Sequence, residues 1–174
     1  MLAKIRLAPK YFTLSAALTG AAILPLLLYS TPLALTFLAL SGLFDILDGK
    51  IARATNRVSD NGALLDICSD RFVEFITVLA LYLVDPQTRG LPCLLILGSI
   101  LLCVTTFLTV GIFTANSSEK SFHYSRGIME RPEAFGFFAA MMLFPTYFFP
   151  LAILFTTLTI LTAFIRTRQF LLRN

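Results

Sequence analysis

Long uncharged stretches alternate with short polar segments along this chain. Three of the stretches contain no charged residue at all, and they cover residues 11–29, 91–114 and 134–165. Two more, about 32–55 and about 60–84, are apolar over one half and polar over the other. A helix needs roughly 20 residues to cross a bilayer core of about 30 Å. Each stretch therefore predicts a membrane-spanning helix.

Residues 134–165 are long enough for one bent helix or for two short spans that break around Pro145 and Pro150. Two spans are favoured, because they return the basic C-terminal end to the side of the N-terminus. The remaining connections are expected at Ser30–Pro32, Asn56–Ser59, Asp85–Gly90 and Ala115–Glu133. The pattern predicts an all-α integral membrane protein, with six transmembrane helices in a single domain over residues 1–174.

Composition supports the membrane assignment. Of the 174 residues, 57% are hydrophobic and only 14% are charged, whereas soluble domains are about 45–50% apolar even with glycine counted. Three cysteines without a CxxC pair argue against a disulfide framework or a zinc site. A soluble enzyme is excluded.

The basic residues give an orientation. There are 14 Lys and Arg against 10 Asp and Glu, a net charge of +4. With six spans and both termini inside, every basic residue except Arg89 lies on the inner side, as positively charged loops favour. We expect both termini in the cytoplasm, in a cell inner membrane or its equivalent. The basic residues are interpreted as topology signals beside anionic lipid, and nucleic acid is not an expected partner.

The second and third helices carry four aspartates where charge is expensive. They are Asp45, Asp48, Asp66 and Asp70. A carboxylate at mid-depth in a membrane costs roughly 2.5–3.5 kcal/mol. Spacings of three and four residues place each pair on one helix face. Because the loop between these helices is short, they should pack as an antiparallel hairpin whose aspartate pairs face each other at the cytoplasmic ends.

Carboxylates at such short distances repel one another unless a cation lies between them. Ligand sets made only of oxygen select hard cations, so Mg²⁺ or Mn²⁺ is expected. Arg53 can anchor the topology, bridge to an aspartate, or grip a phosphate with its forked guanidinium. Glu74 continues the acidic stripe and either pairs with Arg71 or another basic residue, or acts directly in the chemistry. The small residues nearby serve helix packing or ligand approach, and they are Gly49, Ala52 and Gly62.

Together these residues form a recognisable pattern over 26 positions. Its eight fixed residues are Asp45, Asp48, Gly49, Ala52, Arg53, Gly62, Asp66 and Asp70. In identity and spacing the pattern resembles the motif of the CDP-alcohol phosphotransferase family, whose members typically have six transmembrane helices and are often homodimers.

The resemblance implies a reaction and a role for each motif residue. Such enzymes transfer the phosphoalcohol part of a CDP-alcohol, commonly CDP-diacylglycerol, to a hydroxyl acceptor and release CMP. The four aspartates would hold one or two Mg²⁺ or Mn²⁺ ions, and Asp70 would also be the base that takes the proton of the acceptor. The cytidine and its phosphates would be bordered by Gly49, Ala52, Arg53 and Gly62, with Ser59 as a further hydroxyl contact.

The acceptor is less well indicated. The stretch 126–133 is similar to members that use inositol phosphate, so Arg126 and Arg131 can hold an acceptor phosphate or simply anchor the surface. Glycerol phosphate and serine remain alternatives. A cation- or proton-coupled transporter and a membrane prenyltransferase also use intramembrane acids, but aspartates at the inner helix ends beside Arg53 favour the transferase.

Overall fold

The computed structural model describes residues 9–55, 59–115 and 127–172. Over these residues the protein is all-helical, as the hydropathy pattern predicts. In chain order the elements are α1 (Pro9–Tyr29), α2 (Thr31–Ala54), α3 (Asp60–Val84), α4 (Pro86–Ala115), α5 (Arg131–Leu143), the 3₁₀ turn η2 (Pro145–Tyr147) and α6 (Phe148–Leu171).

The helix boundaries follow local chemistry. Ser30 alone separates α1 from α2, and Pro32 lies in the first turn of α2, where a missing N–H costs nothing. Ser59 caps α3, because its hydroxyl accepts a hydrogen bond of 3.2 Å from the backbone N–H of Gly62. The turn expected at Asp85–Gly90 is wrong in extent. Only Asp85 interrupts the helices, since Pro86 suits the first position of α4.

The long apolar stretch after residue 133 divides into two helices, as expected, but only the second is among the segments that qualify as spans. Helix α5 ends at Leu143, Pro145 opens η2, and α6 begins at Phe148. Pro150 lies in the first turn of α6, where no helical hydrogen bond is lost. At its other end α5 begins at Arg131, within the segment expected to be a polar loop.

Four segments of the described chain are long and apolar enough to cross a membrane. They are Lys10–Tyr29, Thr31–Ala54, Pro86–Phe113 and Pro145–Leu171. Helix α3 falls outside this group and carries Asp66 and Asp70 of the motif. Helix α5 has 13 residues, and at 1.5 Å per residue it reaches only about 20 Å. Residues 9–55, 59–115 and 127–172 thus contain six α-helices, as expected, and four segments there qualify as spans by length and composition.

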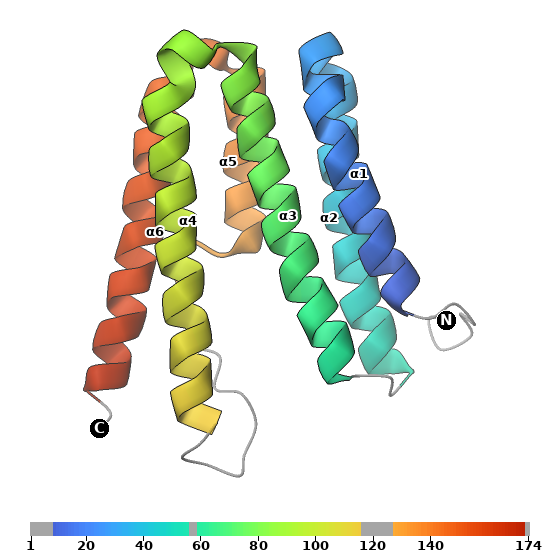
Figure 1. Cartoon of the computed structure of the whole chain (residues 1–174), viewed down its shortest axis with the longest axis vertical. Coiled ribbons are helices and arrows are strands. Elements are labelled where there is room, and N and C mark those ends of the chain that lie inside the picture. The colour runs from blue at the N-terminus through green and yellow to red at the C-terminus, as the bar shows by residue number, and fades with distance from the viewer. Residues whose placement is uncertain (1–8, 56–58, 116–126, 173–174) are drawn as a thin grey trace. The chain divides into compact units, whose positions relative to one another are not determined.

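The helices fall into two compact units that divide at Pro86. In the first unit, α1 lies against both α2 and α3 (Figure 1). The Ser41 hydroxyl of α2 donates to the carbonyl of Ala16 in α1 at 2.9 Å. On the α3 side, a Cβ atom on Gly20 would overlap the Val73 side chain, so only glycine permits this approach.

Helix α1 also changes the expected hairpin. Helices α2 and α3 run antiparallel, as predicted, but in the described residues most of the packing in this unit is made by α1 rather than by direct α2–α3 contact. The N-terminal helix thereby positions the two motif helices.

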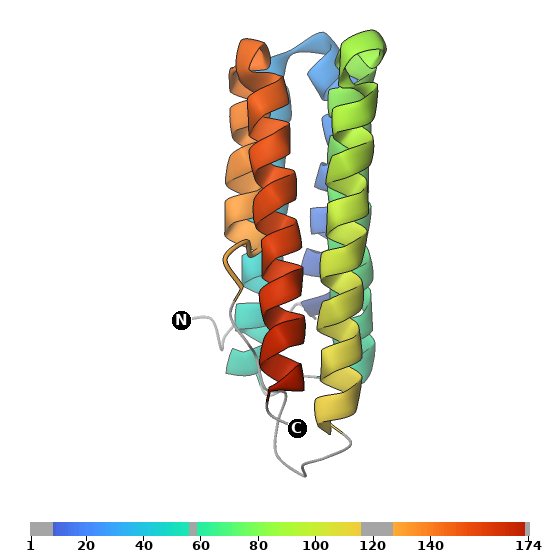
Figure 2. The same ribbon diagram turned by 90° about the vertical axis from the view of Figure 1, so that its left-hand side faces the viewer.

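The second unit is built along α6. Helices α4 and α6 run in the same direction, and the Arg166 guanidinium donates to the carbonyl of Cys103 at 3.1 Å and covers the Phe107 ring. Helix α5 lies beside α6 (Figure 2), where the rings of Phe138 and Phe155 stack with centroids 5.6 Å apart. These contacts lie within the second unit and involve none of the motif residues.

Candidate active site

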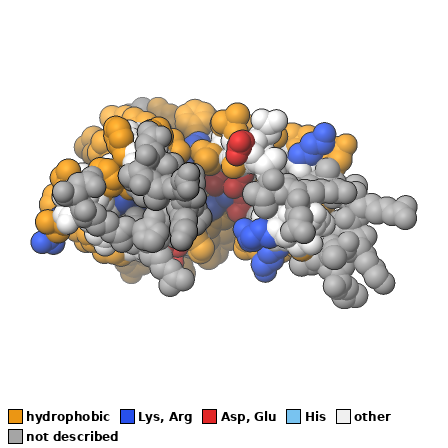
Figure 3. Space-filling view, turned by 90° about the horizontal axis from the view of Figure 1, so that it is seen from below, with side chains coloured by type: hydrophobic (Ala, Val, Ile, Leu, Met, Phe, Trp, Pro, Cys, Tyr) orange, Lys and Arg blue, Asp and Glu red, His pale blue; other side chains and the backbone are white. Residues whose placement is uncertain are grey.

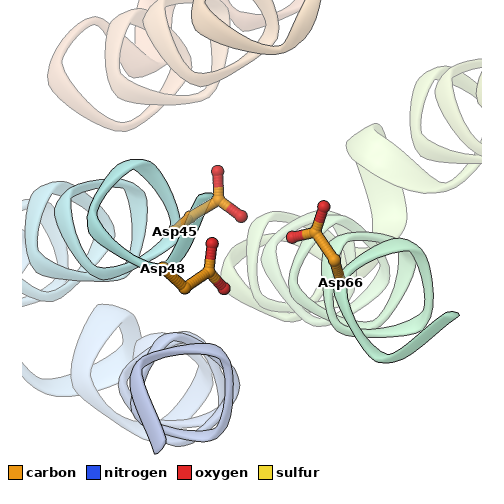
Figure 4. A group of neighbouring side chains, drawn as sticks. All are labelled: Asp45, Asp48 and Asp66. Atoms are coloured by element: carbon orange, nitrogen blue, oxygen red, sulfur yellow. The ribbon is translucent and has the colours of Figure 1, made fainter. Parts of the chain in front are cut away.

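Three of the four predicted aspartates converge. Asp45 and Asp48 lie in the second half of α2, and Asp66 lies in the second turn of α3. One carboxylate oxygen of each lies within 4.8 Å of the others. Figure 4 shows the side chains from α2 and α3 pointing toward one another. Asp48 is only 5% exposed, and the other two are half-buried.

The geometry follows from helical spacing. Asp45 and Asp48 are three residues apart and so share a face of α2. The chain reverses between the end of α2 and the start of α3, which brings Asp66 back to the level of that face. Figure 3 looks at the molecule from this end, where acidic and basic side chains are visible among the hydrophobic ones.

The three carboxylates fit a divalent cation. Oxygen ligands lie about 2.0–2.6 Å from Mg²⁺ or Ca²⁺, so ligands of one ion are separated by up to about 4–5 Å. The oxygen spacing in the cluster is within this range. A donor set made only of carboxylate oxygens suits hard cations such as Mg²⁺ and Mn²⁺. The site therefore has the chemistry that the sequence predicts.

Asp70, the predicted base, lies one helical turn beyond Asp66 on α3 and is half-buried. The structure does not bring it into the group of three, and its role as ligand and base remains a prediction. One turn farther, the buried Glu74 forms an ion pair with Arg71, with 2.7 Å between Oε2 of Glu74 and Nη1 of Arg71. This confirms the pairing expected for Glu74.

The predicted nucleotide residues lie around the same helix ends. Gly49, Ala52 and Arg53 occupy the last two turns of α2, and the exposed Arg53 side chain folds back over Gly49. A Cβ on Gly49 would meet the Arg53 guanidinium at 3.5 Å, an ordinary contact, so the packing of the described residues does not demand glycine there.

Gly62 has a local reason to be small. A Cβ there would lie 3.2 Å from the hydroxyl oxygen of Ser59, which already accepts the Gly62 N–H as the cap of α3. Ser59 and Gly62 thus shape the start of α3, and their nucleotide contacts remain predictions.

The two predicted acceptor residues follow the motif by more than 50 positions in the sequence. Arg126 lies outside the described residues. Arg131 opens α5 in the second unit, where its guanidinium covers the Phe135 ring at 5.5 Å from the centroid. Both assignments remain predictions.

The structure adds a residue that the sequence does not reveal. The hydroxyl of Thr13, on α1, donates a hydrogen bond of 2.6 Å to Oδ2 of Asp48, and both side chains are buried. Thr13 is 35 residues away from Asp48 in the sequence. A threonine in an uncharged apolar helix is ordinarily interpreted as a packing residue. No motif or spacing connects the two positions.

Three curated proteins that are similar to this chain have names that describe related transfer reactions. Over 83 residues the chain is 41% identical to an archaetidylinositol phosphate synthase of Aeropyrum pernix. The aligned region covers 47% of this chain and 43% of that protein. It is 34% identical over 98 residues to a bifunctional IPC transferase and DIPP synthase of Archaeoglobus fulgidus, covering 56% and 20%. A CMP-forming cardiolipin synthase of Streptomyces coelicolor is 50% identical over 48 residues, covering 28% and 22%.

These matches span less than half of the length of each curated relative. A family model, by contrast, covers nearly all of the chain. The model for CDP-alcohol phosphatidyltransferase matches residues 6–167, a range that includes every motif position and both helical units. With its acidic cluster and its motif in place, the chain belongs to the CDP-alcohol phosphatidyltransferase family of enzymes.

Proposed function

We propose that this protein transfers the phosphoalcohol group of a CDP-alcohol, with CDP-diacylglycerol as the first candidate, to a hydroxyl of a small polar acceptor. The observation that carries the proposal is the convergence of Asp45, Asp48 and Asp66 within 4.8 Å at the meeting of the two motif helices. Family membership favours this reaction over a transporter that uses the same acids.

In the proposed step, the acceptor oxygen forms a bond to the phosphorus that carries the alcohol. The bond from this phosphorus to the bridging oxygen breaks, and the electron pair leaves with CMP. Asp70 takes the proton of the acceptor hydroxyl, whose acidity rises as the oxygen attacks. Asp70 lies one turn beyond Asp66 on α3, on the same face of the helix, and its side chain is half-buried.

Asp45, Asp48 and Asp66, with Asp70, would hold one or two Mg²⁺ or Mn²⁺ ions. When bound, such a cation supplies positive charge against the negative charge that develops on the phosphates. Arg53 would contact a phosphate of the nucleotide through its guanidinium, since it is exposed at the end of α2. Gly49 and Ala52 would leave room for the nucleotide along α2, and Ser59 and Gly62 would border it from the start of α3.

For the acceptor we propose inositol phosphate first, with glycerol phosphate and serine as alternatives. The similarity to an archaetidylinositol phosphate synthase supports this order, and Arg126 and Arg131 would hold the phosphate of the acceptor. We further propose a homodimer in the bilayer, as the family resemblance implies. We place both termini and the aspartates on the cytoplasmic side, as the distribution of basic residues favours.

The test uses purified protein in detergent with CDP-diacylglycerol, or with an archaetidyl donor, and Mg²⁺ or Mn²⁺. Inositol phosphate, glycerol phosphate, serine and inositol are supplied separately, and CMP is measured. We expect CMP release that requires the metal and one of these acceptors, and that stops when a chelator is added. Absence of CMP with every donor and acceptor pair refutes the proposal.

A further inference from the structure

The hydroxyl of Thr13 makes a contact that differs from those of its neighbours. Within helices, threonine and serine usually donate to a carbonyl of their own helix, as Thr19, Thr36 and Thr77 do here. Thr13 donates across the α1–α2 interface to a carboxylate. Its hydroxyl therefore contacts one of the three converging aspartates, on another helix.

The hydrogen bond is well placed to fix that carboxylate. At 2.6 Å it is short, as expected where a hydroxyl meets an ionised acceptor. Thr13 is 8% exposed and Asp48 is 5% exposed, so little water competes for either group. A carboxylate has two oxygens with about four acceptor positions, so accepting one proton at Oδ2 leaves capacity for a cation.

Helix α1 is itself held in register against both motif helices. The Ser41 hydroxyl binds the carbonyl of Ala16 on the α2 side. The Ser69 hydroxyl of α3 lies 3.4 Å from the carbonyl of Thr13 itself, and Gly20 lets α1 approach Val73 closely. The Thr13 hydroxyl is therefore presented to Asp48 by a fixed backbone.

From this geometry we infer that Thr13 is a positioning residue: its hydroxyl orients the Asp48 carboxylate for the divalent cation held by Asp45, Asp48 and Asp66. This inference rests on the proposed function, in which the three aspartates bind metal. Partners that orient metal ligands typically change metal affinity or activity by about 10- to 100-fold when they are removed. Thr13 has no place in the bond-breaking step.

The experiment compares Thr13→Val, which keeps the shape but loses the hydroxyl, with Thr13→Ser, which keeps the hydroxyl. Thr13→Ala is measured alongside, in case valine is not accommodated. The matched control is Ser41→Ala, which removes a buried hydrogen bond of the same α1–α2 interface without touching an aspartate. Mn²⁺ binding is measured by electron paramagnetic resonance on the whole 174-residue chain in detergent, without substrate. The Mn²⁺ concentration for half-maximal CMP release is measured separately.

We expect Thr13→Val and Thr13→Ala to weaken Mn²⁺ binding by about 10- to 100-fold, and to raise the half-maximal Mn²⁺ concentration for CMP release in parallel. Thr13→Ser should bind within a few-fold of wild type, and Ser41→Ala should bind as wild type even if it melts earlier. Wild-type affinity in both hydroxyl-free variants overturns the inference, as does an equal loss in Ser41→Ala.

The two proposals fail in different ways. If wild type binds Mn²⁺ and Thr13→Val weakens it, but no CMP forms, the positioning role stands and the proposed reaction falls. If CMP forms but Thr13→Val binds Mn²⁺ as wild type does, only the positioning role falls. A wild-type protein that binds no Mn²⁺ overturns the positioning role whatever the CMP assay gives.

Discussion

Replacement of Asp66 by asparagine should stabilise the metal-free protein and at the same time remove its response to metal. The carboxylate oxygens of Asp45, Asp48 and Asp66 lie within 4.8 Å of one another. At this distance two unit charges repel by about 3.5 kcal/mol, at the effective dielectric constant of about 20 that suits groups near a protein surface. Asp66 takes part in two of the three pairs.

The Asp66→Asn change therefore removes about 7 kcal/mol of repulsion on this scale. Water around the half-buried Asp45 and Asp66 screens part of it, so we expect a net gain of about 1–3 kcal/mol without metal. In a chain of this length each kcal/mol moves the melting temperature by about 2–4 °C. Asparagine keeps the size of aspartate and an acceptor oxygen, so packing at Asp66 changes little.

The assay is thermal unfolding in detergent, once with a chelator and once with saturating Mg²⁺. Wild type should gain stability from the metal, by about 4.1 kcal/mol at a thousand times the dissociation constant. Asp66→Asn should melt above wild type in chelator and below it in Mg²⁺. The control is Asp60→Asn, which removes one charge from the exposed first turn of α3, outside the cluster.

Two results would refute the electrostatic reasoning. One is an Asp66→Asn protein that melts below wild type in chelator and still shows the full shift with Mg²⁺. The other is an Asp60→Asn protein with the same inversion, since a non-specific effect of net charge would then explain the data.

Three further changes test separate parts of the site. Asp70→Asn should lower kcat for CMP release by at least about 100-fold, while the KM for the CDP-alcohol and the melting temperature change little; near-normal turnover would disprove the role as base. Gly49→Ala should raise the KM for the CDP-alcohol yet stabilise α2 by about 0.5–1 kcal/mol, since its Cβ meets only an ordinary contact, and an unchanged KM would remove Gly49 from the nucleotide site. Gly20→Ala should lower the free energy of unfolding by about 1–3 kcal/mol, because the new Cβ overlaps Val73. Thermal unfolding measures this against the control Gly98→Ala, where no described atom lies within 4 Å of the new Cβ. Equal melting temperatures of the two variants would contradict close α1–α3 packing.

Much of the fold can be predicted from the sequence, because membrane helices are long, apolar and uncharged and the segments between them are polar. Uncharged stretches and their polar interruptions located six helices, and Pro145 marked the break between α5 and α6. The turn at Asp85–Gly90 was misjudged because proline and glycine usually interrupt helices, whereas Pro86 here begins one. A tertiary contact also favours helix in this segment, since the buried Arg89 guanidinium covers the Phe148 ring at 4.4 Å from its centroid.

The candidate site divides in the same way between local and non-local information. Spacings of three and four residues predict which aspartates share a face, and the structure confirms the convergence of Asp45, Asp48 and Asp66. The Thr13 contact depends instead on how α1 packs against α2, and no local pattern encodes the register between two apolar helices. Likewise, the short loop indicated direct packing of α2 on α3, because nothing in the sequence marks α1 as the helix that packs against both.

The first compact unit, which ends at Pro86, has a consequence for biosynthesis. It contains all four motif aspartates, both motif helices and the helix that carries Thr13. Domains generally fold in order as the ribosome delivers them, and the ribosome delivers this half first. The acidic cluster can thus assemble in the bilayer while the second half of the chain is still being translated, so a nascent protein truncated after α3 should already retain divalent cations.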